Sequence, residues 1–101
     1  MEKQFFDAPE TEREKQFKEI FTNYMLVSIN RLKDGKIITC YEEIQEMKGM
    51  LIKEAASSEP AISKKTIDAL DVRLQVIGSK LRDGKFFDAY DGMKEIIEMC
   101  G

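Results

Sequence analysis

Apolar residues recur every three or four positions in four separate stretches of this chain, which is the spacing of one face of an α-helix. The first two stripes are Phe17, Ile20, Phe21, Tyr24, Met25, Ser28 and Leu32, then Ile37, Cys40, Tyr41, Ile44, Met47 and Leu51. The last two are Ile67, Leu70, Leu74, Ile77 and Leu81, then Phe86, Ala89, Tyr90, Met93, Ile96, Ile97 and Cys100. The stripes predict helices over 8–33, 37–56, 63–82 and 86–100.

The residues between the stripes are typical of helix ends. Asp7 is suited to cap the first helix, with Pro9 in its first turn and Glu10 at the position of a capping box. Gly35 and Gly84 each follow a stripe directly and are predicted to take the left-handed conformation that ends a helix. The stretch from Ser57 to Ala61 is the one clear linker, after which either Ser58 or Ser63 caps the third helix. Residues 1–7 are expected to form an N-terminal arm.

The two halves of the chain resemble each other at an offset of 49 residues. The segment Leu32-Lys-Asp-Gly-Lys-Ile-Ile-Thr-Cys-Tyr-Glu42 aligns with Leu81-Arg-Asp-Gly-Lys-Phe-Phe-Asp-Ala-Tyr-Asp91. We interpret this as a repeated helix–turn–helix hairpin in which the apolar pair after Lys packs back on the preceding Leu. Short turns make the helices of each hairpin antiparallel neighbours. The prediction is an all-α, four-helix arrangement of two repeated hairpins, 8–56 and 63–100, within a single helical domain over 8–101.

The composition agrees with a small helical domain and narrows its chemistry. The 101 residues are 43% hydrophobic and 35% charged, with few glycines and prolines. The net charge of −3 is spread along the chain, with six basic and seven acidic groups in 1–34, three and five in 35–60, and seven and seven in 61–101. No cluster of Lys and Arg forms a basic stripe, so nucleic-acid binding is not expected.

Residue types that carry catalysis or bind metals are scarce. The chain has no histidine, and its two cysteines, Cys40 and Cys100, lie on apolar stripes as buried thiols would. We therefore expect no enzyme activity, no cofactor and no metal site. Free thiols together with the lack of a secretory signal or a membrane-length apolar run indicate a cytoplasmic protein that does not enter membranes.

The fourth stretch carries one local likeness. Gly84-Lys-Phe-Phe-Asp-Ala89, with Met93 and Ile96 after it, resembles the turn and second helix of a tetratricopeptide repeat over some fifteen residues. The repeat period here is 49 rather than the about 34 of that family, and the family's first-helix pattern is missing. The likeness implies a tight helical hairpin at this point of the chain.

Several apolar residues lie off the four stripes and form the candidate partner surface: Leu26, Met50, Ile52, Val72 and Val76. A helix in a bundle turns only part of its surface inward, so such residues can meet another chain. They favour a non-enzymatic protein–protein interaction module: an adaptor, a regulator, or an inhibitor of a host protein as carried by phages and mobile elements. Its partner is another protein or, in a homodimer, a second copy.

Two alternatives stay open. One is a small helical-bundle enzyme or ligand-binding domain in which charged residues such as Arg31, Arg73 and Arg82 enter an internal cleft. The other is nucleic-acid binding, which requires Lys64, Lys65, Arg73 and Lys80 to gather on one side of the third helix.

Overall fold

The chain folds into four α-helices joined by short connections, as a computed structural model that describes residues 11–100 shows. The helices are α1 (Glu12–Lys33), α2 (Ile37–Ala56), α3 (Lys64–Arg82) and α4 (Phe86–Cys100), and no strand occurs within the described range. The prediction of an all-α fold with four helices is confirmed. The bounds of α2 and α4 agree with those expected, and α3 begins one residue later because Ser63 is its N-cap.

Helix α1 begins later than the predicted residue 8. Thr11 has an extended backbone and accepts a hydrogen bond from the Glu14 backbone N–H, so it is the N-cap. The sequence Thr-Glu-Arg-Glu therefore supplies the helix start that we had assigned to Asp7. Asp7, Pro9, Glu10 and the predicted arm over residues 1–7 lie outside the described residues.

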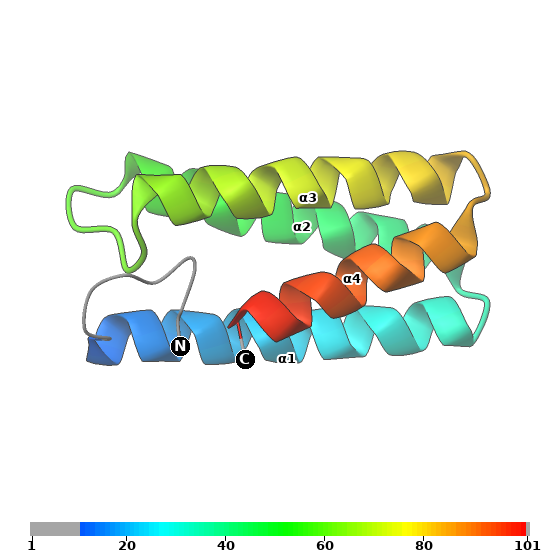
Figure 1. Ribbon diagram of the computed structural model, residues 1–101, viewed down its shortest axis with the longest axis horizontal. Coiled ribbons are helices and arrows are strands. Elements are labelled where there is room, and N and C mark those ends of the chain that lie inside the picture. The colour runs from blue at the N-terminus through cyan, green and yellow to red at the C-terminus, as the bar shows by residue number, and fades with distance from the viewer. Residues whose placement is uncertain (1–10, 101) are drawn as a thin grey trace.

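The helices form a ring in which each packs against its neighbours in sequence and α4 closes against α1. Both Asp-Gly-Lys turns lie at one end of the molecule and the linker 57–63 lies at the other (Figure 1). In the same view α4 runs obliquely in front, from the turn end towards α1. The linker is held down by Ile62, which is buried in the core, and by the Ala61 N–H, which donates to the Glu54 side chain.

The two tight turns have the same geometry at the offset of 49 residues. Gly35 and Gly84 have φ values of 78° and 77°, as predicted for left-handed caps. After α1 the N–H groups of residues 34, 35 and 36 donate to the carbonyls of 30, 32 and 31, and after α3 those of 83, 84 and 85 donate to 79, 81 and 80. These bonds satisfy carbonyls that a helix end otherwise leaves open.

The core follows the same offset. Each buried position of α1 and α2 has a buried counterpart 49 residues later in α3 or α4. The pairs are Phe17 and Thr66, Phe21 and Leu70, Met25 and Leu74, Ser28 and Ile77, Ile29 and Gly78, Leu32 and Leu81, Cys40 and Ala89, Ile44 and Met93, Met47 and Ile96, and Leu51 and Cys100. The two hairpins thus present equivalent faces to one shared core.

Some predicted core positions are wrong. Ile20 and Phe86 are exposed although they fall on the stripes, and Ile29, which the stripe omitted, is buried. Of the apolar pair after each turn, the second residue does not pack back as expected: Ile38 is 76% exposed and Phe87 is 87% exposed, whereas Ile37 packs against the core. Adjacent helical positions point about 100° apart, so the second residue of such a pair turns away from the core.

Candidate interaction surface between helices α2 and α3

The five candidate surface residues are distributed over three helices. Leu26 lies on α1, Met50 and Ile52 on α2, and Val72 and Val76 on α3. Met50 is half-buried and packs against the core, whereas the other four side chains are between 45% and 65% exposed. Of the five, only Val76 lines the groove between α2 and α3, and Ile52 and Val72 each lie one helical turn from a lining residue.

The α2–α3 groove is an open depression along the seam of these two helices, with a volume of about 530 Å³. Its lining consists of Tyr41, Gln45, Lys48, Gln75, Val76, Gly78, Ser79 and Arg82. Helical spacing explains why these residues line up. Tyr41, Gln45 and Lys48 lie at i, i+4 and i+7 on α2, and Gln75, Ser79 and Arg82 have the same spacing on α3.

Ile52 and Val72 continue the two walls of this groove towards the linker end. Ile52 follows Lys48 by four positions on α2, and Val72 precedes Gln75 by three positions on α3. Met50, two positions from Ile52, points about 200° away from it. It lies on the face of α2 where Glu43 and Glu46 contact α1, and Leu26 lies on α1 itself, so neither belongs to the groove.

Gly78 adds no side chain to the middle of this seam. It is buried at the middle of the groove, and a Cβ placed there would lie 3.4 Å from Gln45 Nε2 and 3.6 Å from Tyr41 Cε1. Gly78 therefore lies beside Gln45 and Tyr41. Because the two helices are antiparallel, Arg82 lies at the Tyr41 end of the groove and Gln75 lies beside Lys48.

The groove is positively charged. Lys48 and Arg82 are its two ionisable cations, its lining contains no Asp or Glu, and neither cation is paired with another residue in the range 11–100. Gln45, Gln75, Ser79 and the Tyr41 hydroxyl add neutral hydrogen-bonding groups. On the other side of Val76, by contrast, the depression along α4 is lined by Asp88, Asp91, Glu95 and Glu98 with Lys94.

The α4–α1 seam holds the residues that correspond to the groove at the offset of 49, and a buried side chain lies where the groove has Gly78. Ile29 takes the place of Gly78 and is buried. Lys33 takes the place of Arg82, and its Nζ lies 5.9 Å from the Tyr90 ring centroid, with Lys94 Nζ at 5.6 Å. Ile97, in the place of Lys48, packs against the core. On this seam the two lysines therefore lie near the Tyr90 ring, and the Ile29 side chain occupies the place that has no side chain in the α2–α3 groove.

The arginines proposed for an internal cleft do not converge. Arg31 Nε lies 3.3 Å from Glu43 Oε2 on the α1–α2 seam, where Ser28 also donates to Glu43 at 3.0 Å. Arg73 Nε lies 3.6 Å from Glu95 Oε1 on the α3–α4 seam. Arg82 lines the α2–α3 groove, so each of the three serves a different seam.

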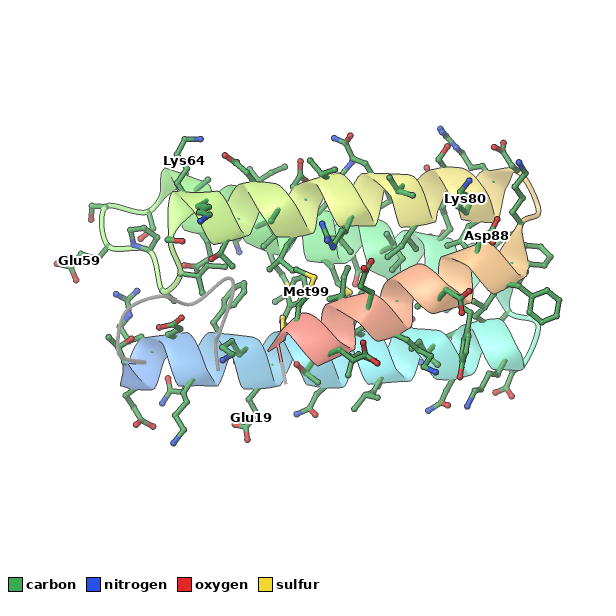
Figure 2. All side chains as sticks on the ribbon, in the orientation of Figure 1. Glu19, Glu59, Lys64, Lys80, Asp88 and Met99 are labelled. Carbon is green, nitrogen blue, oxygen red and sulfur yellow. The ribbon has the colours of Figure 1, made fainter. Side chains whose placement is uncertain are left out.

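The cations proposed for nucleic-acid binding are also dispersed. Lys64 and Arg73 are nine positions apart on α3, which points them about 180° apart, and each has an acidic neighbour, Asp68 and Glu95 respectively. Lys64 and Lys80 lie towards opposite ends of α3 (Figure 2). The four cations named from the sequence therefore form no single patch.

The two thiols are buried and unbridged. Burial, and secondly the charge of Glu43, raise the pKa of Cys40 to about 11. Burial raises the pKa of Cys100 to about 11 as well, although the nearby Lys18 acts in the opposite direction. Within residues 11–100 no three His, Cys, Asp or Glu side chains are grouped as metal ligands, and no helix there has the length and apolar character to cross a membrane.

Two features of this surface were not anticipated from the sequence. Lys48 and Gly78 look unremarkable by themselves, and only the comparison of Gly78 with Ile29 at the offset of 49 marks the position where one seam lacks a side chain.

Comparisons of the chain with protein families, with curated proteins and with solved structures found no match.

Proposed function

We propose that this protein is a non-enzymatic interaction module that binds a partner protein through the α2–α3 groove. The observation that carries the proposal is a cationic groove bordered by the exposed Val76, with the exposed Ile52 and Val72 each one helical turn from a lining residue. Ile52 is 65% exposed, Val72 57% and Val76 50%. Apolar side chains grouped beside a depression with polar hydrogen-bonding groups are typical of protein-binding surfaces.

A role as adaptor, regulator or inhibitor of another protein fits such a surface, because each of these acts by occupying a site rather than by chemistry. The inhibitors encoded by phages and mobile elements are one form of this role. We place the activity in a reducing compartment such as the cytoplasm, which is supported by two free thiols held in the core. The alternative partner is a second copy of the chain, which would bind through the same groove.

The test compares two valines related by the offset of 49. Val76 borders the groove and Val27 is its counterpart on α1, with exposed fractions of 50% and 44%. Tagged wild type, Val76→Asp and Val27→Asp are used to capture proteins from extracts of the cells in which the chain occurs. A protein retained by wild type and Val27→Asp and lost with Val76→Asp is the expected result, because a charge in the apolar part of an interface is desolvated without a mate.

Melting temperatures of the three proteins provide the control for folding. Both valines are exposed, so neither variant should unfold the protein. Equal retention of the captured protein by all three variants would contradict the proposal. Loss of self-association with Val76→Asp, measured by light scattering, would identify the partner as a second copy.

A further inference from the structure

We infer that the partner segment seated in the α2–α3 groove is an amphipathic α-helix with carboxylates about two turns apart on the face that meets the groove. This inference rests on the proposed function, since it names the partner class of the same groove. The juxtaposition that carries it is Lys48 and Arg82 at opposite ends of a seam that contains no carboxylate.

The charge of the groove selects an acidic partner. In residues 11–100 the other three arginines each have an acidic neighbour: Arg13 has Glu59, Arg31 has Glu43 and Arg73 has Glu95. Lys33 and Lys94 lie near the Tyr90 ring. Lys48 and Arg82 have no such partner in that range. An acidic side chain placed in the groove gains charge-assisted hydrogen bonds without displacing an existing ion pair.

The spacing of the two cations sets the spacing of the carboxylates. Arg82 lies at the Tyr41 end of the groove, and Tyr41 and Lys48 are seven residues apart on α2. Seven residues of helix rise about 10 Å. A partner helix aligned with the seam places side chains at i and i+7 at the same separation, so one carboxylate meets each cation.

The walls of the groove also favour a helix over a small anion. Two parallel rows of side chains with helical spacing form a furrow of the kind into which a third helix packs. Ile52, Val72 and Val76 give apolar contacts along its rim, which a free phosphate or carboxylate would not use. At the middle of the seam, Gln45 and Tyr41 lie close to the α3 backbone at Gly78, so that the floor of the furrow is formed by α2 side chains.

The test uses three synthetic peptides of one parent sequence, titrated against the full-length protein by fluorescence anisotropy. The parent is an amphipathic helix with Glu at two positions seven apart and Leu between them. The second peptide carries Gln in place of both Glu residues, and the third carries Pro at its centre, which breaks the helix. We expect the parent to bind and each of the other two to bind at least tenfold more weakly.

Matched protein variants locate the site. Lys48→Glu/Arg82→Glu reverses the two groove cations, and Lys33→Glu/Lys94→Glu makes the same change of net charge on the α4–α1 seam. We expect the first pair to weaken binding of the parent peptide at least tenfold and the second to change it less than threefold. Raising the salt concentration should weaken binding to wild type far more than binding to the Lys48→Glu/Arg82→Glu variant.

The outcomes separate this inference from the proposed function. No binding of the parent peptide, equal binding of its Gln form, or an equal loss with both variant pairs overturns the inference. Equal binding of the Pro peptide would mean that the bound segment is not a helix, and this result also overturns the inference. If a cellular partner is lost with Val76→Asp but still bound by Lys48→Glu/Arg82→Glu, the proposed function is supported. The inference that the partner segment is an acidic helix is then wrong.

Discussion

The α2–α3 groove and the α4–α1 seam are built on the same pattern of buried positions and nevertheless differ at their surfaces. Tyr41 and Tyr90 occupy equivalent places on the two seams. Beside Tyr41 the chain has Gly78 and an open depression, whereas the equivalent of Gly78 is the buried Ile29. The core constrains which positions point inward, and the residues along the outer edges of the seams are free to differ. This difference is the reason that we propose the groove, rather than the α4–α1 seam, as the binding surface.

The largest effects are expected where the two halves are alike. Met25 and Leu74 are equivalent positions and both are completely buried. Met25→Ala and Leu74→Ala should each lower the free energy of unfolding by about 2–5 kcal/mol, because each leaves a cavity in the same shared core. Urea unfolding followed by circular dichroism measures both. A large loss for one variant and almost none for the other would show that the two hairpins do not contribute equally to the core.

The next effect compares the two buried thiols. With a pKa of about 11, Cys40 is a thiolate in roughly one molecule in a thousand at pH 8, about a hundredfold less than an ordinary thiol. Its labelling by a small thiol reagent should be slower than that of an unfolded chain by at least this factor, and should accelerate as the pH rises towards 11.

Cys100 provides the comparison, since its pKa is also raised to about 11 but it lines a shallow depression beside the polar residues of α1. It should react faster than Cys40 because the reagent reaches it more readily. Rapid labelling of Cys40 in the folded protein would mean that α2 turns another face to the core. Mass spectrometry of peptides after timed labelling assigns the two rates.

The fold was largely accessible from the sequence because it depends on local signals. The spacing of apolar residues located four helices, and the glycines after Asp34 and Asp83 located two turns. The start of α1 was missed because two capping patterns, at Asp7 and at Thr11, compete within five residues. Periodicity also placed Phe86 in the core, but it is 41% exposed. Spacing alone does not show how much of the first turn of a helix its neighbours cover.

The groove was accessible only in part. Ile52, Val72 and Val76 were named from the sequence because they lie off the stripes. Lys48 and Arg82 could not be paired with them, because that pairing depends on the register between two antiparallel helices. Leu26 and Met50 satisfied the same sequence criterion but lie elsewhere, and nothing within one helix distinguishes an off-stripe residue beside a groove from one on another seam.

A smaller effect is expected at the two turns. Gly35 and Gly84 have positive φ, and an added Cβ would meet no atom within 4 Å at either site. The cost of Gly35→Val or Gly84→Val is therefore one of backbone conformation alone, about 1 kcal/mol or somewhat more. Thermal unfolding should give similar losses for both variants. A clear difference between them would indicate that one turn has a contact that the other lacks.

The smallest expected change concerns the glycine that keeps the groove open. Gly78 lies inside α3 and does not need a positive φ, and a methyl group there meets Gln45 and Tyr41 at ordinary contact distances of 3.4 and 3.6 Å. Gly78→Ala should raise the free energy of unfolding by up to about 1 kcal/mol through helix propensity. Gly49, with no atom within 4 Å of an added Cβ, gives the reference gain in an open helical site, whereas at Gly92 the Cβ would lie 2.9 Å from Ile77 Cγ1 and should destabilise. If Gly78→Ala raises the melting temperature as Gly49→Ala does and also weakens binding of the acidic peptide, the glycine is retained for the groove at some expense of stability. If the variant is less stable, the seam is already closely packed at this point, and the contrast with the α4–α1 seam is smaller than the difference between glycine and isoleucine suggests.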